Sequence, residues 1–201
     1  MTTGEPRDWE VSYRGDEPAP WDIGRPQAAF VELADRGLLS GVLLDAGCGS
    51  GEHALIAAAR GAVARGVDLS ATAIARARQK ATTRGLDVRF DVGDVLTMNL
   101  PQGGLDTVVD SGLFHVFDDA DRGRYVGVLA RALRPGGRCY VMCFSERQPG
   151  DWGPRRVTCA EIEVAFSTGW SVDRIEPVRF EINPMPDVPH VEAWLASLTR
   201  T

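Results

Sequence analysis

The sequence has no excess of positive charge, no long apolar run and no paired cysteines. With 22 basic and 28 acidic residues its formal net charge is −6, which argues against a nucleic-acid partner because phosphate binding depends on clustered Lys and Arg. The longest apolar runs are strand-sized and fall far short of the roughly 20 residues that cross a bilayer. The opening MTTGEPRDW has no apolar core like that of a secretory signal peptide. These absences predict a cytoplasmic protein with neither a membrane nor a nucleic-acid partner.

Four cysteines occur without a CxxC pair or a histidine at metal-ligand spacing: Cys48, Cys139, Cys143 and Cys159. We therefore expect reduced, mostly buried thiols and no metal site. Any activity should persist in the presence of a chelator.

The pattern along the chain predicts an α/β fold. The 201 residues suit one domain, and from residue 42 onward short β-rich runs alternate with helical stretches, as in parallel sheets with right-handed crossovers. Strands are predicted at 42–46, 62–67, 87–92, 105–109 and 138–145, and a closing strand pair at 172–183 and 191–198. Helices are predicted at 70–83, at 119–133 before the PGG turn at 135–137, and after Thr158, which forms a capping-box pattern with Glu161.

The most informative segment is residues 42–52, VLLDAGCGSGE, in which a buried strand delivers an acid and three glycines to the start of a helix. Glycines are needed where the backbone turns tightly against a bulky ligand and a Cβ would collide. A dinucleotide fold would show GxGxxG, and the acid at Asp45 would repel a pyrophosphate. The GxGxG spacing after an acid instead suits a ligand with a cationic amino-acid moiety.

Two further acids are predicted at the ends of the next strands. Asp68 follows the second strand, 23 residues after Asp45, where a carboxylate can accept hydrogen bonds from both ribose hydroxyls. Leu69 beside it would pack on an adenine ring. Asp94 and Val95 follow the third strand, where Asp94 can accept from the exocyclic amine of adenine. Three strand ends thus converge on one nucleoside.

With these motifs the sequence resembles the class I S-adenosylmethionine-dependent methyltransferases. Residues 133–138, LRPGGR, are similar to that superfamily's turn before its fifth strand, and residues 105–110, LDTVVD, to its fourth-strand motif. The resemblance implies a doubly wound, Rossmann-like sheet of seven strands, mostly parallel with an antiparallel last strand, and S-adenosylmethionine as the cofactor. The cofactor contacts it implies, together with two polar or aromatic positions nearby, are Trp21, Asp45, Gly47, Gly49, Gly51, Asp68, Leu69, Asp94, Val95 and Ser111.

Residues 20–27, PWDIGRPQ, look like the N-terminal signature of the thiopurine and thiol or halide methyltransferase-like branch. Within that branch, residues 110–115, DSGLFH, and the tail from Gly169 to Leu195 resemble actinobacterial enzymes that methylate heterocyclic toxins such as hydroxyquinolones. The resemblance implies methylation of a small hydroxylated aromatic heterocycle by a monomer or homodimer. Transfer to oxygen, nitrogen or the sulfur of a thiol stays open.

Methyl transfer from a sulfonium is an in-line displacement, so the enzyme mainly aligns the acceptor and excludes water. His115 follows the fourth strand and is the candidate base for an acceptor that must lose a proton, with packing inside its loop as the alternative. Asp110 in the same loop is expected to orient His115, to line the methyl-donor channel or to bind backbone amides of the turn. His53 is expected to support the glycine-loop helix rather than to react.

The first 30 residues are predicted to form an aromatic lid over a methyltransferase domain at 31–201. Trp9, Tyr13 and Trp21 would exclude water and offer ring faces to a sulfonium, or would simply fasten the N-terminus to the core. An apolar loop at 185–189, with Phe114 and Phe117, is expected to line a flat aromatic substrate pocket.

Two functions of other classes stay open at this point. A nicotinamide-dependent oxidoreductase shares the doubly wound sheet and the acid after the second strand, although the GxGxG spacing speaks against it. A noncatalytic protein that binds S-adenosylmethionine as a sensor or partner subunit would show the same cofactor motifs.

Overall fold

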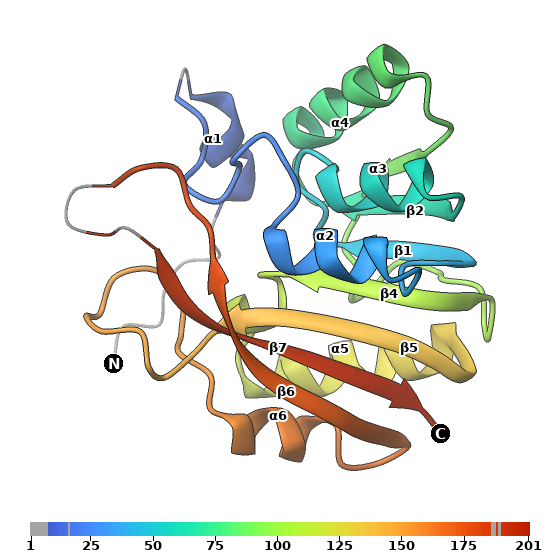
Figure 1. Cartoon of the computed structure of the whole chain (residues 1–201), viewed down its shortest axis with the longest axis vertical. Helices are drawn as coiled ribbons and strands as arrows, with labels where there is room; N and C mark the ends of the chain where they lie inside the picture. The colour runs from blue at the N-terminus through green and yellow to red at the C-terminus, as the bar shows by residue number, and fades with distance from the viewer. Residues whose placement is uncertain (1–7, 16, 186–187, 189) are drawn as a thin grey trace.

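The computed structural model describes residues 8–15, 17–185, 188 and 190–201. A seven-stranded sheet runs through the molecule in the order β3-β2-β1-β4-β5-β7-β6 (Figure 1). Its strands are β1 Val42–Ala46, β2 Val63–Asp68, β3 Arg89–Val92, β4 Leu105–Ser111, β5 Leu133–Phe144, β6 Trp170–Phe180 and β7 Val191–Arg200. This is the predicted α/β sheet with all of its expected strands.

The first five strands of the sheet are parallel, and β7 runs antiparallel to both β5 and β6. The central strand β1 is apolar on both faces, since Leu43 and Leu44 point to opposite sides and are both fully buried. The expected mostly parallel sheet with an antiparallel last strand is confirmed. Because the chain order reverses between β1 and β4, loops after these two strands diverge and leave a crevice for a ligand.

Helices cover both faces of the sheet. They are α1 Trp9–Arg14, α2 Ala28–Asp35, α3 Glu52–Ala59, α4 Ala71–Arg84, α5 Asp119–Ala132 and α6 Cys159–Ala165, with a 3₁₀ turn, η1, at Phe114–Val116. Apolar side chains of α2, α3 and α4 pack on one face, and those of α5 and α6 on the other. None of the helices in the described ranges is long and apolar enough to span a membrane.

Local sequence signals explain where the clearest helices begin and end. Ser70 caps α4 by accepting the Ala73 N–H at 3.0 Å, and Gly85 ends it in the left-handed conformation at φ +62°. Thr158 and Glu161 form the predicted capping box of α6.

The fifth strand differs from its prediction at its beginning. β5 starts at Leu133 directly after α5, whereas 138–145 was expected. The PGG turn lies within this strand: Gly136 has φ +77°, and the pairing with β4 shifts register there. The helix α5 ends before the PGG turn, as expected. The turn interrupts the hydrogen-bonded pairing of β5 with β4 but does not end the strand β5.

The N-terminal segment runs past the carboxyl ends of the parallel strands, where α1 lies beside α4 (Figure 1). The expected boundary at residue 30 falls inside α2, whose Phe30 is completely buried in the core. The part of the chain that lies over the carboxyl ends of the strands is thus the described portion of residues 8–27.

Candidate active site

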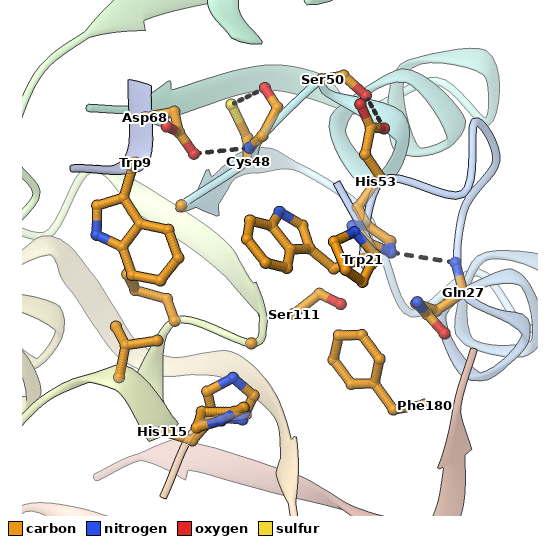
Figure 2. Close-up of a pocket in the computed structure, with 18 of the residues that line it drawn as sticks. Trp9, Trp21, Gln27, Cys48, Ser50, His53, Asp68, Ser111, His115 and Phe180 are labelled. Atoms are coloured by element: carbon orange, nitrogen blue, oxygen red, sulfur yellow. Dashed lines mark hydrogen bonds between the residues drawn. The ribbon is translucent and has the colours of Figure 1, made fainter. Parts of the chain in front are cut away.

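A cavity of about 380 Å³ opens at the carboxyl ends of the parallel strands, beneath the N-terminal segment. This volume lies in the usual range for small-molecule sites. Figure 2 shows Trp9 and Trp21 projecting into it between Asp68 and His115. One end is polar and formed by the loops after β1, β2 and β3, and the other is aromatic.

The glycine loop after β1 forms the floor of the polar end. Gly47, Gly49 and Gly51 have φ values of +66°, +51° and +86°, which L side chains rarely adopt. Gly47 and Gly49 line the cavity. Gly51 does not line it, because a Cβ there would lie 2.7 Å from Phe90 and 2.8 Å from Ala77. Gly47 and Gly49 therefore lie on the cavity wall, close to Leu113 and Tyr13, whereas Gly51 packs against the core.

Asp45 lies under the glycine loop rather than on the cavity wall. Its Oδ2 accepts the Ala54 N–H at 3.0 Å, while its Oδ1 is buried with no hydrogen-bond partner in the described part of the chain. Burial, with smaller contributions from Asp68 and Asp110, raises the pKa of Asp45 to about 8. A buried carboxyl oxygen with no partner, beneath the cavity-lining Gly47 and Gly49, fits a cationic group such as the methionine moiety of S-adenosylmethionine, whose charge would favour ionisation of Asp45.

Asp68 fastens the glycine loop to the end of β2 and also faces the cavity. It accepts the N–H of Gly49 and the N–H of Ser70, each at 2.8 Å, and burial raises its pKa. Carboxylate oxygens have further lone pairs, so ribose hydroxyls can still donate to it. Beside it, Leu69 lines the cavity with 54% of its surface exposed, a free apolar face for a ring.

The loop after β3 completes the nucleoside end. Asp94 and Val95 both line the cavity. Asp94 accepts the Leu96 N–H at 2.9 Å through Oδ1, which holds the carboxylate in a fixed orientation. The three strand ends that the sequence predicted to converge thus meet around one space.

Aromatic side chains of the N-terminal segment cover this end. Trp9, Tyr13 and Trp21 all line the cavity. Trp21 Nε1 donates to the Tyr13 hydroxyl at 2.9 Å, and its ring meets Trp9 edge-on at 5.7 Å between centroids. The Tyr13 hydroxyl reaches down to Gly49. The aromatic residues of the N-terminal segment and the glycine loop therefore lie close together at this end of the cavity.

Two polar attachments that sequence reasoning missed hold the N-terminal segment. Glu10 accepts hydrogen bonds from the hydroxyls of Ser70 and Thr72, both at 2.6 Å, and from the Thr72 N–H at 3.2 Å. These bonds hold the pKa of Glu10 at about 2, well below its usual value. Gln27 exchanges hydrogen bonds with the backbone of Glu181, at 2.8 and 2.7 Å. The PWDIGRPQ signature contains Gln27 and so gave a hint of the second attachment, whereas nothing in the sequence pointed to Glu10.

His115, in the 3₁₀ turn after β4, lines the cavity near its middle. Its Nδ1 accepts the Phe144 N–H at 3.0 Å, and its ring meets the Phe144 ring edge-on at 4.9 Å. A neutral imidazole with an occupied acceptor at Nδ1 carries its proton on Nε2. The hydrogen bond from the Phe144 N–H therefore assigns the ring proton of a neutral His115 to Nε2.

Asp110 does not line the cavity, so its position does not fit the expected role of lining the methyl-donor channel. Its completely buried carboxylate accepts the N–H groups of Leu113 and Phe114 at 2.7 and 3.0 Å, and the Tyr125 hydroxyl at 2.9 Å. Burial raises its pKa to about 7. Asp110 holds the turn that carries His115, which is the amide-binding alternative. Ser111, by contrast, lines the cavity.

The far end of the cavity is aromatic. Its rings come from four separate places in the chain, namely Phe117, Phe144, Trp152 and Phe180, with Met185 beside them. The expected contribution of Phe114 is wrong, because this side chain is completely buried on the opposite side of its turn, under the Arg122 guanidinium at 4.8 Å. Of the expected loop at 185–189, residues 186, 187 and 189 lie outside the described residues.

His53 also lines the cavity, with its Nε2 accepting the Gln27 N–H at 3.2 Å. Burial lowers its pKa to about 4, so the ring is neutral, consistent with a supporting role. Across the described ranges no three His, Cys, Asp or Glu side chains are grouped to hold a metal ion. Cys48, Cys139 and Cys143 are buried thiols, and Cys159 is partly exposed.

The strand order, the antiparallel β7 and the glycine loop at the floor of a covered cavity define a class I methyltransferase fold. The methyltransferase domain family matches residues 43–137. The 2-heptyl-1-hydroxyquinolin-4(1H)-one methyltransferase of Mycobacteroides abscessus is 38% identical over 184 residues, 87% of this chain and 81% of its own. The chain therefore belongs to the methyltransferase domain family, and the dehydrogenase alternative falls away.

Two further relatives extend along almost the whole chain. A probable thiol methyltransferase of Arabidopsis thaliana is 26% identical over 95% of this chain and 85% of its own. A structure from work on the conversion of a disulfide bond into a thioacetal group during echinomycin biosynthesis has a TM-score of 0.83, at 36% identity, over 95% of this chain and 89% of its own. More distant solved methyltransferases with this fold hold S-adenosylhomocysteine. These two structures are 20% and 22% identical to the chain and show the fold alone, so S-adenosylmethionine stays the cofactor that the motifs predict.

Proposed function

We propose that this chain transfers the methyl group of S-adenosylmethionine to an oxygen or nitrogen atom of a hydroxylated aromatic heterocycle. The observation that carries the proposal is one continuous cavity with a nucleoside-binding end, lined by Asp68 and Asp94, and an aromatic end, lined by Phe144 and Phe180. A flat acceptor held between aromatic rings would face a methyl donor anchored at the polar end.

In this proposal the polar end binds the cofactor through groups already fixed in place. Asp68 accepts from the ribose hydroxyls, Leu69 packs on the adenine and Asp94 accepts from its amine. Gly47 and Gly49 admit the methionine moiety above Asp45, and Trp21 and Ser111 lie at its sides. When bound, the cofactor supplies a methyl group on a positively charged sulfur.

The protein's own contribution to the transfer is alignment and the exclusion of water. Trp9, Tyr13 and Trp21 act as the lid over the cofactor. His115 contacts the acceptor and donates from Nε2 to an oxygen of the heterocycle, while Asp110 positions it through the turn. An acceptor that is already ionised at neutral pH needs alignment rather than a base, which suits an acidic hydroxyl.

The relatives support this acceptor class and supply the second candidate. The M. abscessus relative is named for a hydroxylated quinolone heterocycle and shares 38% of its residues over most of both chains. The Arabidopsis relative is named as a thiol methyltransferase at lower identity. A thiol is the second acceptor class, because it also ionises without a strong base.

The proposal places the enzyme in the cytoplasm, as a monomer or homodimer that acts on small molecules and not on nucleic acid. The net charge of −6 supports the last point, since an acidic chain as a whole repels a phosphate backbone.

The test is a methylation assay with S-adenosylmethionine and a panel of acceptors headed by 2-heptyl-1-hydroxyquinolin-4(1H)-one, followed by simple phenols, N-heterocycles and aryl thiols. Mass spectrometry should find one added methyl group on the hydroxyquinolone, with or without a chelator. Methylation of the thiols alone would favour the second candidate. Tight cofactor binding with no product from any acceptor would favour a noncatalytic binding protein.

A further inference from the structure

Residues 146–156, here called the acceptor loop, form one wall of the aromatic end of the cavity. The two ends of the loop are joined, because the Val157 N–H donates to the Phe144 carbonyl at 2.9 Å and the Glu146 N–H donates to the Val157 carbonyl at 3.2 Å. Between these ends, Trp152, Gly153 and Pro154 line the cavity. The loop leaves and re-enters the sheet at one place, as compact surface loops with functional roles do.

The guanidinium of Arg156 fills the inside of this loop. Its Nε donates to the carbonyl of Gln148 at 3.3 Å, and Nη1 to that of Pro154 at 2.7 Å. Its Nη2 donates to the carbonyls of Gly150 and Trp152, at 3.2 and 2.9 Å. One side chain thus ties together four carbonyls of the loop, and the described ion pairs do not include it.

The same guanidinium lies against the two rings that shape the wall. Its carbon is 5.5 Å from the centroid of Phe144 and 5.7 Å from that of Trp152, and these two rings meet edge-on at 5.9 Å. Both distances are within the range of cation–π attraction. Arg156 is therefore in contact with the aromatic wall on one side and with the loop backbone on the other.

We propose that Arg156 is a positioning residue that sets the shape of the acceptor wall, and thereby the affinity and selectivity for flat aromatic acceptors. The inference rests on the proposed function of the aromatic end. A guanidinium presents five donors in a planar fork, whereas a lysine ammonium is a point with three, and cannot reach four carbonyls spread around the loop. Lysine should therefore fail to replace it although the charge is kept.

The test compares Arg156→Lys and Arg156→Ala with Arg155→Ala. Arg155 is a matched control, because it belongs to the same loop but pairs with Asp119 and Glu161 at the surface. For the hydroxyquinolone, both Arg156 variants should raise KM by about tenfold or more and change kcat by less than about threefold. Affinity for S-adenosylhomocysteine should not change in any of the three, and KM should not change in Arg155→Ala.

A second variant reaches the same wall and keeps the Arg156 side chain, whose Nη1 would lie 3.9 Å from the added Cβ. A Cβ on Gly153, where φ is +81°, would lie 3.3 Å from the Phe144 ring, so Gly153→Ala should shift the wall and raise KM in the same way. Should the Arg156 variants fail to fold, an unchanged KM in Gly153→Ala would show that this wall does not affect acceptor binding, and would overturn the role of Arg156 with it.

Acceptor binding is also measured by calorimetry on the S-adenosylhomocysteine complex, which needs no turnover. Unchanged acceptor affinity in Arg156→Ala, or a loss of cofactor affinity as large as the loss of acceptor affinity, would overturn the role of Arg156 alone. A wild-type complex that binds no aromatic acceptor of the panel would overturn the proposed function together with this inference.

Discussion

The phenol oxygen of Tyr13 lies over Gly49, 2.5 Å from the position that a Cβ on this glycine would take. Tyr13 is buried and its hydroxyl accepts the Trp21 indole N–H at 2.9 Å. Tyr13 of the N-terminal segment therefore meets the glycine loop directly, and a cofactor held by the loop must fit beside this contact.

We predict that Gly49→Ala weakens S-adenosylhomocysteine binding by about tenfold or more, because the methyl group displaces Tyr13 and strains the loop. The matched control is Gly37→Ala, at φ +70° with nothing within 4 Å of its Cβ. The two variants share backbone strain but not the contact. Equal affinities in calorimetry would contradict the contact between lid and loop.

The attachment of α1 to α4 through Glu10 should hold the lid closed. Glu10→Ala is predicted to weaken S-adenosylhomocysteine binding severalfold. Thr72→Val removes only the hydroxyl hydrogen bond to Glu10 and should weaken binding less. The double variant should bind no more weakly than Glu10→Ala. Glu17→Ala, at an exposed site, is the control. Effects that simply add would show that the pair does not act as one attachment.

The same attachment predicts a pH dependence. The pKa of Glu10 is held at about 2, below its ordinary 4.5, so its stabilising effect is complete above about pH 4.5 and is lost as the pH falls toward 2. Between pH 5 and 8, Glu10→Ala should therefore weaken cofactor binding by a constant factor. A factor that changes within this range would contradict the assignment.

His115 is predicted to act as a hydrogen-bond donor, because its Nδ1 is occupied by the Phe144 N–H. Glutamine keeps an N–H donor but is no base, so His115→Gln should retain methyl transfer to the hydroxyquinolone within about tenfold. His190→Gln is the control, since that half-buried ring does not line the cavity and pairs with Glu192. A fall of 100- to 10,000-fold would instead establish His115 as a general base.

The buried acid Asp45 should make the stability of the free protein depend on pH. Its pKa of about 8 in the folded chain lies above the ordinary 3.8, so its contribution is present below pH 4 and is lost as the pH rises through 8. Asp45→Asn removes this loss. Relative to wild type, the free energy of unfolding of the variant should rise by on the order of a few kcal/mol between pH 5 and pH 8.5. A pH-independent difference in urea unfolding would contradict this.

Much of the fold was predictable because its signals are local. Ser70 and Gly85 mark the ends of α4, Thr158 and Glu161 cap α6, and the apolar run at β1 leads into the glycine loop. Each depends on neighbours within a few residues. The same holds for Asp68 and Asp94, which follow strands whose parallel ends must meet at one edge of the sheet.

The parts that escaped prediction depend on contacts between distant segments. Phe114 and Phe117 are neighbours in one turn, yet only Phe117 reaches the cavity, because the turn directs Phe114 toward α6. Asp110 could be assigned to the turn only once Tyr125 and the amides were placed around it. Trp152 and Phe180 join the site through tertiary contacts with Phe144, and the sequence carries no local signal for them.

The central claim is that the polar end of the cavity binds the methyl-donor cofactor, and the most direct measurement is calorimetric titration of the purified chain with S-adenosylhomocysteine. The account predicts one site of about micromolar affinity or better, and a loss of at least about tenfold in Asp68→Ala, which removes the loop attachment and the proposed ribose acceptor. The exposed carboxylate Asp35, paired with Arg60, provides the control Asp35→Ala. Absence of binding, or equal affinity in Asp68→Ala and wild type, would contradict the account.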